Sequence, residues 1–117
     1  MTEAELAQKF VEYLRDLDYK DLYFELLGID ILVKEKHYTI GLEVKTSLNF
    51  KVIEQAYENL QRKVNYSYVA VPHSRDHFFQ RRICKDYGIG VITYDRGNVY
   101  MDMKAKFNRH NDPFGRS

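Results

Sequence analysis

Apolar residues recur at helical spacing at the start of the chain and at alternating spacing after about residue 21. Leu6, Phe10 and Leu14 fall on one helical stripe, and Thr2 with Glu5 has the spacing of a capping box. The pattern predicts, in chain order, a helix over residues 3–17, strands near 21–26, 29–35 and 38–46, a helix over 50–64, a strand over 66–71, a helix over 75–87, and strands over 89–94 and 99–103.

The order of these elements predicts a mixed β-sheet flanked by helices. Three strands in succession with short links favour an antiparallel meander, whereas strands separated by helices favour parallel crossovers. We therefore expect an α/β fold with one domain over residues 1–104, in the order αβββαβ followed by αββ. Residues 105–117 are basic and have little apolar content, so we expect them to form a flexible tail.

Composition is that of one globular domain and points to no partner. The chain has 117 residues, 44% of them hydrophobic and 30% charged, and its formal net charge is +1. This balance argues against nucleic-acid binding by overall charge, although a local basic patch stays possible. The single Cys84 excludes an intrachain disulfide and a cysteine-based zinc cage. With no apolar run of membrane-spanning length and no secretory signal, we expect a cytoplasmic protein without a membrane partner.

The strands near 29–35 and 38–46 carry the residues of chemical interest. A turn centred on residues 36–37 pairs residues whose numbers sum to 73, which places Asp30 opposite Glu43 and Gly28 opposite Lys45. The apolar residues are expected to share the buried face, leaving Asp30, Glu43 and Lys45 on the other one; these apolar residues are Ile29, Ile31, Val33, Tyr38, Ile40, Leu42 and Val44.

Two carboxylates placed opposite each other are destabilising by themselves. A raised pKa, a basic neighbour such as Lys45, or a bound cation can offset this repulsion. Paired carboxylates beside a lysine suit Mg²⁺, which takes oxygen ligands and keeps several waters for a phosphate substrate. The alternative is that Asp30, Glu43 and Lys45 are exposed polar residues of an amphipathic strand. The opposed acid pair favours the metal site.

The pattern resembles the PD-(D/E)xK nuclease superfamily, which includes many restriction endonucleases and Holliday-junction resolvases. The resemblance consists of Asp30, twelve intervening residues and Glu43-Val44-Lys45, within the order helix, three-strand meander, helix, strand over residues 3–71. Ile29 stands where the family name has proline. The resemblance implies a restriction-endonuclease-like core in which Asp30, Glu43 and the Val44 carbonyl bind the metal and Lys45 is catalytic.

Two further positions follow from the resemblance. Several members carry a glutamine in the helix after the lysine strand, and Gln55 fits that place as a catalytic residue, although a solvated flank of the helix explains it equally well. Some relatives also use an acid of the first helix, and Glu3, Glu5 and Glu12 are candidates among which the sequence does not choose.

The helix expected over residues 75–87 is locally basic. Its cations are Arg75, Arg81, Arg82 and Lys85, offset by Asp76 and Asp86. A solvated helix face explains them, but in a nuclease they are expected to contact DNA phosphates without conferring sequence specificity.

These observations predict a metal-dependent endonuclease that hydrolyses DNA phosphodiester bonds with Mg²⁺, which Mn²⁺ can replace, and with no small-molecule cofactor. The alternatives are a non-catalytic nucleic-acid-binding module on the same fold and a nuclease acting on RNA. Degenerate members of the superfamily lose a ligand or the lysine, whereas all three residues are present here. Because one site cuts one strand, we also expect a homodimer.

Overall fold

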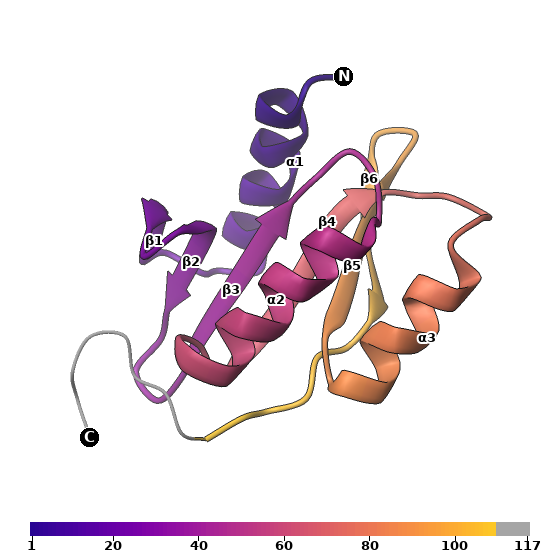
Figure 1. Cartoon of the computed structure of the whole chain (residues 1–117). Helices are drawn as coiled ribbons and strands as arrows, with labels where there is room; N and C mark the ends of the chain where they lie inside the picture. Colours follow the sequence, from indigo (N-terminus) through magenta and orange to yellow (C-terminus); the bar gives the residue numbers. More distant parts are fainter. Residues whose placement is uncertain (110–117) are drawn as a thin grey trace.

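The computed structural model describes residues 1–109 and contains six strands and three helices (Figure 1). No helix of this part of the chain is long and apolar enough to cross a membrane. In chain order the elements are α1 (Glu3–Asp16), β1 (Leu22–Leu26), β2 (Ile29–Lys34), β3 (Thr39–Val44), α2 (Phe50–Arg62), β4 (Tyr66–Pro72), α3 (Phe78–Tyr87), β5 (Gly90–Asp95) and β6 (Asn98–Met103).

The six strands form one mixed sheet in the order β1-β2-β3-β4-β5-β6. The first three strands are an antiparallel meander, β3, β4 and β5 are parallel, and β6 returns antiparallel to β5. The predicted α/β architecture and the predicted strand directions are confirmed. The parallel crossovers through α2 and α3 place both helices on the same face of the sheet, and α1 covers the other face (Figure 1).

Local chemistry explains where several elements begin and end. The predicted capping box starts α1, because the Thr2 hydroxyl accepts from the Glu5 N–H and the Glu5 carboxylate accepts from the Thr2 N–H. Leu27 and Gly28 link β1 to β2 with φ values of 58° and 75°, the two positive φ angles of a two-residue hairpin turn. Gly88 ends α3 in the left-handed conformation that favours glycine.

The predicted register between β2 and β3 is confirmed. Four residue pairs run from Lys34 opposite Thr39 to Ile31 opposite Leu42, and in each of them the numbers sum to 73. The ladder stops there, one step before the predicted pair of Asp30 and Glu43. The predicted neighbourhood of Gly28 is wrong, because Gly28 lies in the turn between β1 and β2, where a Cβ would meet the Lys63 ammonium at 3.6 Å rather than Lys45.

The predicted alternation of β2 fails at Asp30. Ile31 belongs to the apolar cluster on the α1 side, whereas Ile29 packs with Leu32 and Val64 in a separate cluster. The backbone explains the change: Glu25 has a φ of 54°, and the ladder between β1 and β2 skips the position where Glu25 would face Asp30. This local irregularity shifts the side-chain phase of the hairpin by one residue.

The third helix begins later than its sequence pattern predicts. The Ser74 hydroxyl accepts from the Asp76 N–H, which closes a local turn, and His77 then adopts a φ of 67° before α3 starts at Phe78. Arg75 therefore lies in the loop between β4 and α3 and not on the helix. Because β3 and β4 are parallel, this loop lies at the same edge of the sheet as the end of β3.

The packed domain extends beyond residue 104, where the sequence places its boundary. Ala105 is buried, and the Lys106 N–H donates to the Gly88 carbonyl. The Asn108 side chain donates to the Leu60 carbonyl, and the Asn65 side chain donates to the Asn108 carbonyl. Residues 105–108 are therefore packed against or hydrogen-bonded to the rest of the domain, while residues 110–117 of the predicted tail lie outside the described residues.

Candidate metal and nuclease site

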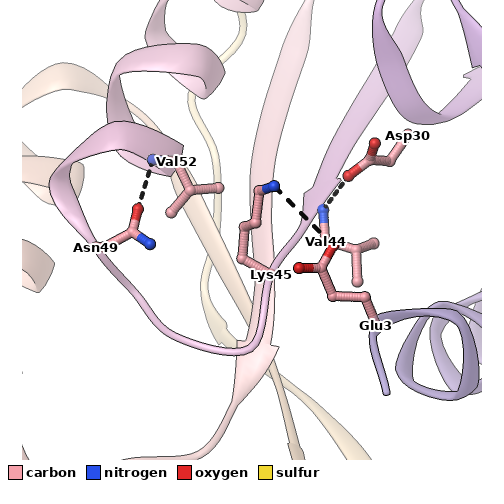
Figure 2. A network of polar contacts seen from close by, with 6 residues as sticks. All are labelled: Glu3, Asp30, Val44, Lys45, Asn49 and Val52. Carbon is pink, nitrogen blue, oxygen red and sulfur yellow. Dashed lines mark hydrogen bonds and ion pairs between the residues drawn. The ribbon is translucent and has the colours of Figure 1, made fainter.

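The candidate site lies at the carboxyl end of β3, where β2 and β3 separate. The Val44 N–H, two residues beyond the last paired residue Leu42, donates to Asp30 Oδ2 at an N···O distance of 2.8 Å (Figure 2). A side-chain carboxylate thus takes the place of a backbone acceptor at this point. The bond fixes the Asp30 side chain at the edge of β3, beside the residue whose carbonyl is a predicted metal ligand.

Glu43 is a buried carboxyl group, only 3% exposed. One oxygen accepts from the Asn59 side-chain amide of α2 at 2.9 Å. The pKa of Glu43 is raised to about 7, mainly by burial and to a smaller extent by the nearby Asp30 charge. The Asn59 hydrogen bond, the Asp30 N–H and, least of all, the Lys45 charge act in the opposite direction. The proximity of the Asp30 charge therefore favours the protonated form of Glu43.

Lys45 extends from the end of β3 toward the start of α1. Its ammonium lies 4.0 Å from Glu3 Oε1, and about a third of its side chain is exposed (Figure 2). Of the three first-helix acids left open by the sequence, Glu3 is the one near the site, since Glu5 is engaged in the capping box and Glu12 is exposed. Lys45 is thus oriented by Glu3, and its charge acts on Glu43 from farther away.

Asp30 reaches the site from a different direction than predicted. It borders an open cavity of about 280 Å³ on the α1 side of the sheet, together with Glu3, Glu25 and Val44, whereas Glu43 points to α2. The phase shift in β2 explains this placement. The two acids therefore approach the end of β3 from its two sides rather than lying side by side on one face.

Gln55 lies on α2, four residues before Asn59, and hence on the same flank of the helix and one turn nearer the end of β3. Its Oε1 atom is buried and accepts no hydrogen bond from the part of the chain that the structure describes. A buried acceptor without a donor is costly, so this atom is available for a water or substrate group. The predicted position of Gln55 beside the site is consistent with this geometry.

The four predicted phosphate-binding cations have different surroundings. Arg81 forms an ion pair with Asp102 of β6, and Arg82 lies 3.4 Å from Asp86, one turn along α3. Arg75 is exposed in the loop at the site edge of the sheet, whereas Lys85 is exposed in the last turn of α3, toward the opposite edge. Arg75 and Arg81 thus both lie toward the site edge of the sheet, and Arg81 borders a small pocket together with Leu48 and Pro72.

Sequence reasoning missed Asn59, the side-chain partner of Glu43. The sequence does contain a signal for this residue. Asn59 lies three residues after Ala56, within the apolar stripe of α2, and a buried amide there needs a hydrogen-bonding partner. Glu3 was foreseen only as one of three candidates, because the spacing within a helix does not reveal which turn meets a neighbouring strand.

The acidic side chains at the end of β3 are oxygen donors, the type that a hard divalent cation prefers. Within residues 1–109 no group of three or more His, Cys, Asp or Glu side chains is gathered to hold a metal. Mg²⁺ does not require one, because it is commonly bound by one or two carboxylates, with waters and substrate oxygens completing its shell. Asp30, Glu43 and the Val44 carbonyl are oxygen donors of the type that Mg²⁺ takes, although the two acids reach the end of β3 from different sides.

Comparison with known proteins adds no family to this description. No family model matches the chain, and neither a curated protein nor a solved structure is significantly similar to it. The resemblance to the PD-(D/E)xK nucleases therefore stays a prediction based on the residues and their geometry.

Proposed function

We propose that this protein is a Mg²⁺-dependent endonuclease with a restriction-endonuclease-like core that hydrolyses DNA phosphodiester bonds. The observation that carries the proposal is Glu43: a carboxyl 3% exposed, with a pKa raised to about 7, next to a second acid at an open edge of the sheet. A carboxyl group buried only for packing would be replaceable by an apolar residue at no loss. Its position beside Asp30 and near Lys45 favours a role that needs negative charge.

In this proposal Asp30 and Glu43 hold the metal, together with the Val44 carbonyl. Asn59 orients Glu43 through its hydrogen bond, and the Val44 N–H orients Asp30 in the same way. When bound, the ion polarises the phosphodiester and lowers the pKa of a water molecule. Glu43 would have to give up the proton that it retains near neutral pH in order to hold the ion.

Lys45 has a separate role. Its ammonium, held toward Glu3 at 4.0 Å, is positioned to orient the attacking water or to stabilise negative charge that develops on the phosphate. Gln55, with an unpartnered buried oxygen, is a second group that can orient water. Neither Lys45 nor Gln55 needs to bind the metal. Their substitution should therefore lower turnover, whereas substitution of Asp30 or Glu43 should lower metal affinity.

DNA is expected to reach the site along the edge formed by the carboxyl ends of the parallel strands. Of the predicted phosphate contacts at this edge, Arg75 is the one proposed to meet DNA, because Arg81 already has an acidic partner in Asp102. Cutting both strands of a duplex needs two such sites, so a homodimer remains part of the proposal.

The deciding experiment is a cleavage assay on linear, nicked, single-stranded and branched DNA and on RNA, each with Mg²⁺ and with EDTA. The proposal expects cleavage of at least one DNA substrate in Mg²⁺, none in EDTA, and none by Asp30→Asn. Binding of DNA without cleavage would identify a non-catalytic module instead. Cleavage of RNA alone would mean that the substrate is RNA and not DNA. Metal-independent cleavage would contradict the role assigned to the two acids.

A further inference from the structure

The side of α3 that faces β6 carries a hollow lined by one aromatic ring and three cations. Phe78, Arg81, Arg82 and Lys85 recur at helical spacing, so they share one side of α3. Together with Met103 of β6 they line a hollow of about 230 Å³, which we call the α3/β6 hollow. Among the residues that the structure describes, no acid belongs to this lining.

The ring of Phe78 has no partner in the fold. Phe78 is 81% exposed, more than any other large hydrophobic residue within residues 1–109. Its neighbour Phe79 turns toward α2, where its ring meets Phe50 edge-to-face. No ring contact of Phe78 occurs within residues 1–109. A ring that packs against no other ring is available to stack on a planar group of a ligand, here beside three cations.

The three cations of the hollow differ in their partners. Arg81 forms an ion pair with Asp102, and Arg82 forms one with Asp86. Lys85 is exposed and has no acidic partner in the described part of the chain. The two arginines are therefore largely neutralised, and the charge that the hollow offers to a ligand is that of Lys85.

Two further lysines extend this positive charge past the end of α3. Lys104 directly follows Met103, and the Cβ of Lys106 lies against Gly88, the residue that ends α3. Both lysines are exposed and lack an acidic partner within residues 1–109. Three unpaired lysines thus gather along and beyond one helix, in a chain whose net charge is only +1.

We propose that the α3/β6 hollow binds single-stranded nucleic acid, with a base stacked on Phe78 and the phosphates of neighbouring nucleotides on Lys85, Lys104 and Lys106. Proteins that bind single strands combine aromatic rings with a cationic groove, because every base has a π face and every nucleotide a negative charge. The bases of an intact duplex are stacked inside it and do not reach such a ring. α3 has 10 residues and is about 15 Å long, which matches about four stacked nucleotides.

The hollow begins at the same edge of the sheet as the candidate site. α3 follows β4, and β3, β4 and β5 are parallel, so Phe78 in its first turn lies toward the edge where Lys45 follows β3 (Figure 1). A strand bound along α3 therefore leads toward the site. On the proposed nuclease function, this assigns the substrate class as DNA with a single-stranded segment next to the cleaved bond. That consequence rests on the proposed function, whereas the binding itself does not.

The first test compares two ligands of equal charge, an oligothymidylate of about eight nucleotides and an abasic phosphodiester chain of the same length. Both are titrated in EDTA, so that no metal-dependent cleavage occurs. The parent should bind the oligothymidylate about 5–150-fold more tightly, the range for one stacked base. Phe78→Leu should lose most of this difference and bind the abasic chain as the parent does. Phe79→Leu is the matched control and should keep the difference, because the Phe79 ring contacts Phe50.

The second test concerns the phosphates. Lys85→Gln should weaken both ligands by the same factor and reduce the slope of log affinity against log salt by about 0.7. Lys36→Gln, in the exposed turn between β2 and β3, is the control and should change neither affinity. Equal affinity of the parent for the two ligands, binding of neither ligand, or a loss in Phe79→Leu as large as in Phe78→Leu would overturn the proposal.

The third test addresses the substrate class in Mg²⁺. Below saturation, a duplex with a single-stranded extension should be cleaved at least about fivefold faster than the same duplex with blunt ends, and Phe78→Leu should remove the difference. Cleavage without this preference would overturn the assigned substrate class. Base-dependent binding without cleavage of any substrate would contradict the nuclease function and support the α3/β6 hollow as a single-strand binding surface.

Discussion

The end of β3 and the exposed side of α3 differ in whether their charged side chains have partners of opposite charge. On α3 the two arginines with resolved partners are matched by acids, Arg81 by Asp102 and Arg82 by Asp86. At the end of β3, no ion pair among residues 1–109 neutralises Glu43, whose side-chain partner is the uncharged Asn59. The comparison shows that Arg81 and Arg82 are neutralised within the fold, whereas Glu43 has only an uncharged side-chain partner, and it is there that the proposed function places a cation.

The largest effect is expected from the two acids. Asp30→Asn and Glu43→Gln each replace a charged oxygen ligand by a neutral amide, so metal-dependent cleavage should fall at least about 10³-fold, beyond the range of one electrostatic contact. Initial rates on the best DNA substrate measure this. Arg81→Gln is the matched control from α3 and should keep its activity. If it loses as much activity as the two acid variants, the end of β3 is not specifically required for cleavage.

Lys45→Ala should lower turnover about 10²–10³-fold, because it removes a charge that acts on the attacking water or on the transition state. Metal affinity should be unchanged or higher, since one positive charge near the two acids is lost. Rates at saturating Mn²⁺, compared with affinity from calorimetry, separate the two effects. If the variant cleaves DNA at the parent rate, Lys45 is only a surface charge.

Asn59→Leu should reduce metal affinity about 10–100-fold, the range for the loss of a group that orients a metal ligand. The substitution removes the hydrogen bond that lowers the pKa of Glu43, so metal binding should also need a higher pH than in the parent. Calorimetric titrations of Mn²⁺ at several pH values test this. Asn49→Ala, which removes only the cap of α2, is the control and should leave the pH dependence unchanged.

The metal-free protein should lose stability as the pH rises through 7. The folded pKa of Glu43, about 7, is above its ordinary value of 4.5, so its favourable contribution is complete below pH 4.5 and is lost as the pH rises through 7. Glu43→Gln should therefore be more stable than the parent at pH 8, by up to about 3 kcal/mol, and similar at pH 4.5. Urea unfolding at both pH values tests the sign of this stability difference. Equal stabilities at pH 8 would mean that the ionised Glu43 does not destabilise the metal-free protein.

The smallest effects are expected from the basic side chains. Arg75→Ala should weaken DNA binding in a salt-dependent way and reduce the slope of log affinity against log salt by about one. Arg81→Ala should change that slope little and reduce stability by about 1 kcal/mol or less, because its ion pair with Asp102 is partly exposed. Binding titrations at three salt concentrations distinguish the two residues. Identical slopes for both variants would mean that the α3 pairs open on DNA.

The sequence predicted the elements, the sheet type and the β2–β3 register because each depends on local periodicity or on a short turn. It could not predict the phase shift at Asp30, which depends on the left-handed backbone of Glu25, a residue with no intrinsic preference for it. It also could not predict which acid of α1 meets Lys45, or that Arg81 pairs with Asp102 twenty-one residues later. Such contacts depend on how separate elements pack, and no spacing rule encodes them.

The most direct test of the account is a calorimetric Mn²⁺ titration of the parent, Asp30→Asn and Glu43→Gln at pH 6, 7 and 8. The account predicts binding by the parent, with release of a proton at pH 6 that disappears at pH 8, and loss of binding in both variants, because Glu43 must give up its proton to hold the metal. A parent that binds no Mn²⁺, or variants that bind it as tightly as the parent, would contradict the assignment of Asp30 and Glu43 as a metal site.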